Sequence, residues 1–483
     1  MATLTTRAPG QEAPLADHAK LVPLLITLAV GLVIWFIPPP AGVEVAAWHL
    51  LAIFVATIVG IILKPLPMGA VAMIGIMATA LTKTLTIGES LSGFNNTTIW
   101  LIVTAFFISR GFIKTGLGER IAYYFMSVLG KRTLGLAYGL IGTDLVLAPA
   151  IPSNTARGGG IVYPVLLSLC KAYGSNPDDG TANRMGAFLV RSVFQGLVVT
   201  SAMFLTAMAA NPLAVELAAG QGINISWGQW AIAASVPGLL SLIAIPYILY
   251  RLNPPEIKTT PEAAEMAKEK LQKMGAVKVP EWIMLAAFVL LIGLWIGSGA
   301  LSINATTTAL VGLGLLLLTG VLTWGDILNE KGAWDTLVWF AALVMMADFL
   351  NKLGLIPWFS EEMGAAVGGF AWVPAFLVLA LVYFYSHYFF ASCTAHVSAM
   401  YAPFLIVSVA AGTPPLLAAL VLAFFSNLFA GTTHYGTGPG PVFFGSGFVS
   451  MTDWWKHGLL ISVLNIVIWL VVGGLWWKIL GLW

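Results

Sequence analysis

Near the middle of an apolar stretch at 133–172, the chain reads Pro152-Ser153-Asn154-Thr155-Ala156-Arg157-Gly158-Gly159-Gly160. Proline and three consecutive glycines interrupt a helix, so each half is too short to cross a hydrocarbon core of about 30 Å. Main chain that is not helical survives at membrane depth only where it is buried in protein or lines a cavity. The pattern therefore predicts a re-entrant helical hairpin whose tip belongs to a site.

A second apolar stretch, 372–411, is interrupted in the same way at Ser392-Cys393-Thr394. A shift of 239 positions lays 153–157 on 392–396 and Pro164 on Pro403. A single Ser-Asn-Thr is an ordinary sequence for capping a helix. Its recurrence at equivalent positions of the two halves indicates a binding site instead.

The composition excludes an ordinary soluble domain. Of the 483 residues, 59% are hydrophobic and 9% are charged, against about 25% charged in soluble domains. A net charge of +2 gives no case for nucleic-acid binding. Cys170 and Cys393 are too few for a disulfide framework, and we expect neither a metal nor a cofactor. The chain is predicted to be a polytopic protein of the lipid bilayer.

The predicted fold is all-α, with about eleven transmembrane helices and the two re-entrant hairpins. The predicted spans are 21–37, 46–63, 68–82, 97–113, 184–219, 228–250, 282–297, 306–322, 336–350, 413–435 and 457–479. With the N-terminus inside, most Lys and Arg residues, from Arg7 onward, fall on the cytoplasmic side. This bias predicts a multi-pass protein of the cell inner (plasma) membrane with a cytoplasmic N-terminus.

The order of the spans predicts two inverted repeats, because an odd number of crossings separates equivalent points. This is the architecture of secondary transporters, which bind substrate near the midplane on broken helices. The predicted divisions are 1–45 for the tail and first span, 46–250 for the first repeat with hairpin 133–172 and broken helix 184–219, 251–280 for a cytoplasmic linker helix, and 281–483 for the second repeat with hairpin 372–411 and broken helix 413–445.

The glycine-rich run from Gly431 to Pro441 cannot be a regular helix. It lacks the Gly-Lys-Ser/Thr ending of a nucleotide phosphate loop. We interpret it as the unwound middle of a broken helix, with Thr206 to Pro212 as its counterpart, although either segment could be a flexible kink. Each hairpin tip adds hydroxyls and a helix N-terminus, and Arg157 adds a cation, so the site suits a carboxylate. Asp144 is expected to be paired inside the protein.

The segment 152–164, together with Tyr388 to Ser392, Tyr435 to Pro439 and Phe444 to Gly447, resembles the divalent anion/sodium symporter family. The likeness is to members that exchange 2-oxoglutarate, malate, succinate, citrate or tartrate. It implies a homodimer in which a transport domain moves against a scaffold as an elevator. The candidate substrate-binding residues are Ser153, Asn154, Thr155, Arg157, Thr206, Asn211, Ser392, Cys393, Thr394, His396, Thr437, Gly438 and Pro439.

Two departures from the sodium-coupled members set the predicted mechanism. Cys393 stands where they carry a second tip Asn, and Gly440 stands where their Pro-Pro-Asn turn would place another. Arg157 and His396 occupy equivalent positions just past the tips, where a fixed cation could replace a bound ion. We therefore predict obligate exchange of di- or tricarboxylates. The alternatives are a sodium-coupled dicarboxylate symporter, an anion channel, and a membrane enzyme, for which no catalytic motif is found.

Overall fold

The computed structural model describes residues 19–297, 303–367 and 371–483; the first eighteen residues of the predicted tail, including Arg7, lie outside them. The described residues form helices and one isolated β-bridge, between Arg132 and Thr259. Within these ranges, ten helices are long and apolar enough to cross a membrane. The predicted class, an all-α polytopic membrane protein, is confirmed.

The helices fall into two series of similar order, joined by α13 (Pro261–Met274). The first series is α1 (Leu21–Phe36), α2 (Val45–Leu63), α3 (Met68–Leu81), α4 (Ile87–Ser90), α5 (Thr97–Thr115), α6 (Leu117–Leu129), α7 (Thr133–Leu147), α8 (Asn154–Arg157), α9 (Tyr163–Ala172), α10 (Gly186–Met203), α11 (Ala210–Ala219) and α12 (Trp227–Leu252). The second is α14 (Val279–Ile296), α16 (Ala305–Leu318), α17 (Trp324–Leu328), α18 (Lys331–Lys352), α19 (Leu355–Val367), α20 (Trp372–Tyr385), α21 (Cys393–His396), α22 (Ala402–Ala410), α23 (Pro415–Leu428), α24 (Pro439–Phe444), α25 (Met451–Val467) and α26 (Gly474–Ile479).

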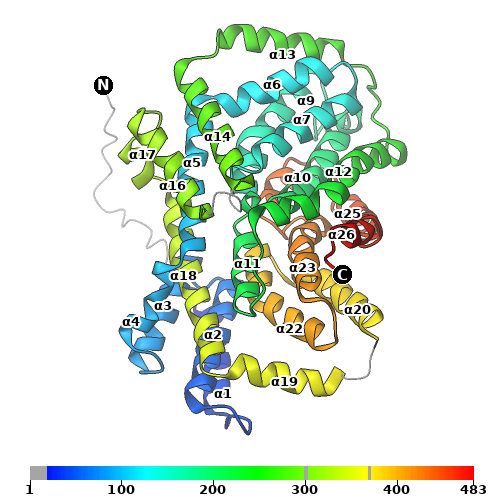
Figure 1. The fold of residues 1–483 in the computed structure, drawn as a ribbon. Coiled ribbons are helices and arrows are strands. Elements are labelled where there is room, and N and C mark those ends of the chain that lie inside the picture. Colours follow the sequence, from blue (N-terminus) through cyan, green and yellow to red (C-terminus); the bar gives the residue numbers. More distant parts are fainter. Residues whose placement is uncertain (1–18, 298–302, 368–370) are drawn as a thin grey trace, which may run out of the picture.

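The two hairpins enter the molecule from opposite ends. In Figure 1 the first hairpin, α7 to α9, lies in the upper part with α6 and α13, whereas α19, α20 and α22 lie in the lower part. The helices α6 and α19 were not predicted from the sequence. Each is a thirteen-residue helix that directly precedes its hairpin.

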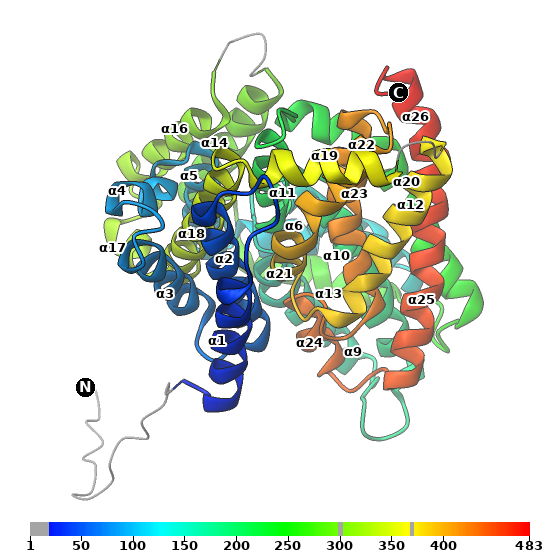
Figure 2. The ribbon, with the colours of Figure 1, turned by 90° about the horizontal axis from the view of Figure 1, so that it is seen from below.

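Seen from below, the helices form two bundles side by side (Figure 2). One bundle contains α1 to α5, α14 and α16 to α18, which pack on one another. The other contains both hairpins, the broken helices α10–α11 and α23–α24, and α12, α25 and α26. All the tips and breaks predicted to form the site therefore belong to the second bundle.

Candidate functional site

The first hairpin tip presents the N-terminus of a helix that begins at Asn154. Ser153 caps this helix, because its hydroxyl accepts a hydrogen bond from the main-chain N–H of Ala156 at 3.1 Å. The helix then passes through a π-helical turn, Gly158–Val162, before α9. Pro164 lacks the N–H that a regular α-turn requires, which accounts for the wide turn.

The second tip repeats this local structure at the equivalent residues. Its helix begins at Cys393, and the Ser392 hydroxyl accepts from the N–H of Ala395 at 3.4 Å. A π-helical turn, Val397–Tyr401, follows just before Pro403. Two helix N-termini, each with main-chain N–H groups that have no partner within their own helix, thus mark the two tips.

Both tips contact one segment of the second broken helix, between the end of its 3₁₀ turn at Thr432 and Pro439, where α24 begins. The side-chain amide of Asn154 donates to Thr437 Oγ1 at 2.9 Å. From the other hairpin, Cys393 Sγ lies 3.4 Å from the carbonyl oxygen of Gly436. Two predicted tips and one predicted break, far apart in the sequence, therefore meet at residues 436–438.

Gly438 is needed for this close approach. A Cβ atom at Gly438 would lie 2.2 Å from Thr155 Oγ1, which is far inside van der Waals contact. Thr155 and Gly438 are nevertheless exposed, and Asn154, Ser392 and Thr394 are partly exposed. These residues leave hydroxyl, amide and main-chain groups accessible beside the two helix N-termini.

The first broken helix contributes bracing contacts instead of exposed groups. Thr206 and Asn211 are fully buried. Thr206 Oγ1 donates to the Pro149 carbonyl at 2.5 Å, and the amide of Asn211 donates to the carbonyls of Ser201 and Phe204. In this structure both side chains hold the unwound main chain in place, and neither is directed to an exposed surface.

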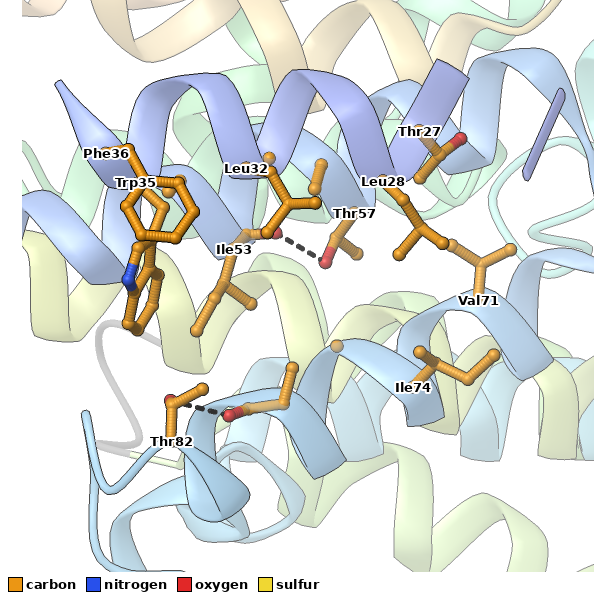
Figure 3. Close-up of a pocket in the computed structure, with 15 residues that line it drawn as sticks. Thr27, Leu28, Leu32, Trp35, Phe36, Ile53, Thr57, Val71, Ile74 and Thr82 are labelled. Carbon is orange, nitrogen blue, oxygen red and sulfur yellow. Dashed lines mark hydrogen bonds between the residues drawn. The ribbon is translucent and has the colours of Figure 1, made fainter. Parts of the chain in front are cut away.

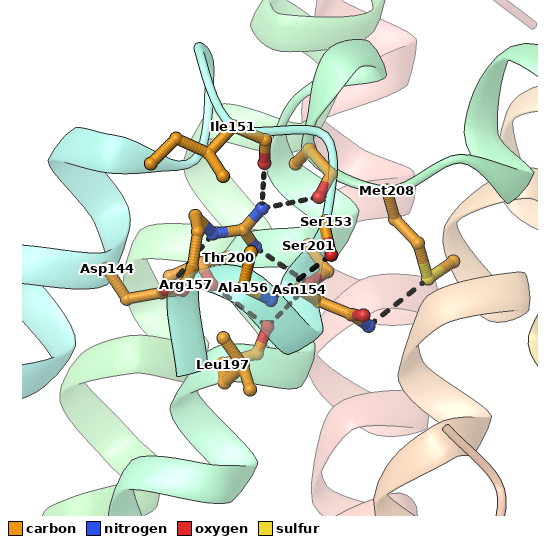
Figure 4. Close-up of polar contacts among 11 residues, drawn as sticks. Asp144, Ile151, Ser153, Asn154, Ala156, Arg157, Leu197, Thr200, Ser201 and Met208 are labelled. Carbon is orange, nitrogen blue, oxygen red and sulfur yellow. Dashed lines mark hydrogen bonds and ion pairs between the residues drawn. The ribbon is translucent and has the colours of Figure 1, made fainter. Parts of the chain in front are cut away.

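Arg157 is completely buried behind the first tip (Figure 4). Its Nε donates to Asp144 Oδ1 at 3.0 Å, and Nη1 donates to the carbonyls of Ile151 and Ala207 at 2.5 Å each. Its Nη2 donates to Ser201 Oγ at 3.1 Å. The guanidinium thereby ties the hairpin tip to the break between α10 and α11.

This arrangement corrects the expectation that Arg157 offers an unpaired charge to a carboxylate. Asp144, which the sequence indicated to be paired, neutralises the guanidinium, and Thr200 donates a hydrogen bond to the second carboxylate oxygen. Most of the guanidinium donors are already used on protein acceptors. Neither the carbonyl partners nor the contact of Asn154 with Met208 Sδ was predicted, because main-chain atoms and a thioether carry no sequence signal.

His396 is also completely buried, at the equivalent position behind the second tip. It has no carboxylate partner among the ion pairs of the described residues. Instead its Nδ1 lies 3.0 Å from Nδ1 of His387, and its Nε2 lies 3.2 Å from Ser386 Oγ. Over residues 19–297, 303–367 and 371–483, no group of three His, Cys, Asp or Glu residues could hold a metal ion.

A separate cavity lies in the first bundle, between α1, α2 and α3 (Figure 3). Its volume is about 290 Å³, and its lining contains no charged side chain. The hydroxyls of Thr57 and Thr82 donate to carbonyls of their own helices. This cavity offers nothing to compensate a carboxylate, so the region of the two tips remains the candidate site.

Two broken hairpins and two broken helices that meet in one bundle define a secondary transporter of the membrane. A family model described as the sodium:sulfate symporter transmembrane region matches residues 18–483. The chain therefore belongs to the divalent anion/sodium symporter family and is a transporter. The prediction that the chain is a transporter and not an enzyme is confirmed by the family.

The relatives narrow the type of transporter. The chain is 61% identical to the putative malate transporter YflS of Bacillus subtilis, over 99% of this chain and all of the relative. It is 55% identical to the chloroplastic dicarboxylate transporter 1 of Spinacia oleracea, over 96% of this chain and 82% of the relative. The crystal structure of the YdaH transporter of Alcanivorax borkumensis has a similar fold, with a TM-score of 0.54 at 12% identity, covering 95% of this chain and 96% of that one.

Proposed function

We propose that the protein exchanges di- or tricarboxylates of the 2-oxoglutarate, malate, succinate, citrate or tartrate class, and that it does so without sodium. The anion binds at the two hairpin tips and residues 436–438. Two helix N-termini supply main-chain N–H groups and positive dipole ends, which attract carboxylates. Hydroxyls of Ser153, Thr155, Ser392 and Thr394, with the amide of Asn154, complete the ligand set.

The observation that carries this proposal is the contact of Arg157 Nη1 with two carbonyls, one from the hairpin tip and one from the first broken helix. Converging main-chain carbonyls of this kind attract a cation. A guanidinium that already lies between them does permanently what a bound sodium ion would do only when present. His396, behind the other tip, is the second group that replaces an ion.

Obligate exchange is expected because the empty site has polar groups without partners, which hinder the movement of the empty carrier. Because Asp144 neutralises Arg157, the barrier to movement of the empty carrier comes mainly from the two helix ends and their unpaired N–H groups. In a medium without water, each unpaired polar group costs several kcal/mol. A bound anion pairs with these groups, so the loaded carrier crosses and the empty one does not.

The two bundles support an elevator mechanism. In the proposed motion, the bundle with the tips carries the anion past the bundle of α1 to α5, α14 and α16 to α18, which acts as scaffold and forms a homodimer. The excess of Lys and Arg on one side supports a plasma-membrane protein with a cytoplasmic N-terminus.

Purified protein in liposomes tests the exchange. We expect labelled succinate to enter vesicles preloaded with unlabelled succinate and to stay out of empty vesicles, with or without a sodium gradient. Concentrative uptake into empty vesicles under an inward sodium gradient would establish the symporter alternative and refute the proposal. A current that does not saturate with succinate would establish a channel.

A further inference from the structure

Two histidines of the second hairpin form a buried pair next to the candidate site. His387, in the 3₁₀ turn before the tip, and His396, just after it, are both fully buried. Their Nδ1 atoms lie 3.0 Å apart. His387 Nε2 lies 3.0 Å from the Gly436 carbonyl oxygen, and a Cβ at Gly436 would lie 2.6 Å from this Nε2.

The hydrogen bonds of the pair can be counted. A carbonyl only accepts, so His387 Nε2 carries a hydrogen, and the contact between the Nδ1 atoms requires one more. In the contact between His396 Nε2 and Ser386 Oγ, either atom can be the hydrogen-bond donor. Ser386 Oγ also lies 2.8 Å from the Tyr383 carbonyl, to which it can donate its single hydrogen.

If Ser386 donates to His396, the two rings share two hydrogens and the pair is neutral. If Ser386 donates to the Tyr383 carbonyl, its oxygen accepts a hydrogen from His396 Nε2. The pair then holds three hydrogens and one positive charge. Rotation of the Ser386 hydroxyl hydrogen therefore turns Ser386 Oγ into a hydrogen-bond acceptor for an extra proton on His396 Nε2. No heavier atom has to move.

The surroundings of the pair contain no fixed counter-charge among the described contacts. Phe429 stacks on His387 at 3.8 Å and on His396 at 4.5 Å, and Phe390 stacks on His396 at 4.5 Å between ring centroids. The titratable groups against the pair are Tyr383 on α20, 4.7 Å from the His396 ring, and Cys393 on α21, whose Sγ contacts the same Gly436 carbonyl. The segment after α23 brings two more residues to the pair: Phe429, which begins the 3₁₀ turn, and Thr433, which follows that turn.

A buried charge without a partner is costly, so the empty site favours the neutral pair. We propose that the His387–His396 pair takes up one proton when a dicarboxylate dianion binds at the tips, so that proton and anion move together. This inference rests on the proposed binding of a dicarboxylate. The Gly436 carbonyl connects the pair directly to Thr437, and the helix of the second tip connects His396 to Ser392.

Calorimetry of succinate binding tests the coupling. The binding heat of the purified protein is measured in buffers of different ionisation enthalpy, at a pH where succinate is fully a dianion. We expect an uptake of about one proton per bound succinate. Succinate that binds without proton exchange would overturn the inference and leave the proposed function intact, whereas a lack of binding would count against the proposed function itself.

Three variants separate the pair from general effects. His387→Gln should bind succinate more weakly and without proton uptake. Ser386→Ala removes the acceptor for the third hydrogen and should reduce proton uptake, and Ser386→Thr, which keeps the hydroxyl, should restore it. The control is His49→Gln, because His49 stacks on Trp35 in the other bundle. Full proton uptake by folded Ser386→Ala protein would contradict the role of the pair.

Discussion

The two hairpin tips have the same main-chain conformation but differ in the side chains buried behind it. Asp144 and Arg157 in the first half correspond, at a shift of 239, to Tyr383 and His396 in the second. The first pair is an ion pair, and the second is an aromatic contact in which Tyr383 shares a hydrogen bond with Ser426. The serine caps and π-turns are thus compatible with either an ion pair or an aromatic contact behind them.

Arg157→Gln should produce the largest effect, because it leaves Asp144 buried without a counter-charge. Breaking a buried ion pair in this way costs about 3–5 kcal/mol. We expect a marked fall in melting temperature and loss of exchange. The double variant Asp144→Asn/Arg157→Gln should recover part of the stability without recovering exchange. A single variant as stable as the wild type would show that the pair does not hold the first tip.

Gly438→Ala should abolish exchange, because the new Cβ would collide with Thr155 Oγ1 and separate the first tip from the second broken helix. Overpacking of this kind costs about 1–3 kcal/mol. The matched control is Gly314→Ala in α16, where a Cβ would meet nothing within 4 Å. Counterflow of succinate measures both variants, and equal activity would mean that residues 436–438 do not meet the first tip during transport.

His396→Gln should destabilise the protein less than Arg157→Gln. It removes hydrogen bonds that each contribute about 0.5–1.5 kcal/mol, but it leaves no buried charge unpaired. The comparison of melting temperatures therefore tests the difference between the tips. A loss at His396 equal to that at Arg157 would indicate that the second tip also depends on a fixed charge.

Lys114→Ala should have the smallest effect, although it also breaks an ion pair. Lys114 lies 2.6 Å from Asp326 and is exposed, and exposed pairs contribute about 0.2–1 kcal/mol. The lysine holds the pKa of Asp326 down at about 2, so its contribution is present at neutral pH and is lost as the pH falls from the ordinary carboxyl value towards that pKa. Thermal melts at pH 7 should therefore differ slightly between wild type and variant.

Much of the fold could be predicted from the sequence, because apolar runs and their Pro and Gly interruptions have direct physical consequences. The reversal before Asn154 and the unwound segment before Pro439 follow from residues that cannot continue a helix. The helices α6 and α19 could not be found as apolar runs, since polar residues interrupt each of them. A search for a period of 3.6 residues would have detected α6, whose polar and apolar residues lie on opposite faces.

The site was only partly predictable. The sequence indicated that Asp144 would be paired, but its partner depended on the direction of the Arg157 side chain, which spacing alone does not fix. His387 gave no signal, because it precedes the tip by several residues and meets His396 only when the 3₁₀ turn folds back. The similarity of the two halves of the sequence indicated that Arg157 and His396 are equivalent positions. What each side chain does could be read only from its contacts in the structure.

The most direct test measures the affinity of the purified protein for succinate as sodium is replaced by choline at constant ionic strength. If Arg157 and the groups behind the second tip take the place of bound sodium, as proposed, the dissociation constant should be the same in both salts. A dissociation constant that falls steadily with rising sodium would contradict the account, because it would show that the site still requires a dissolved ion.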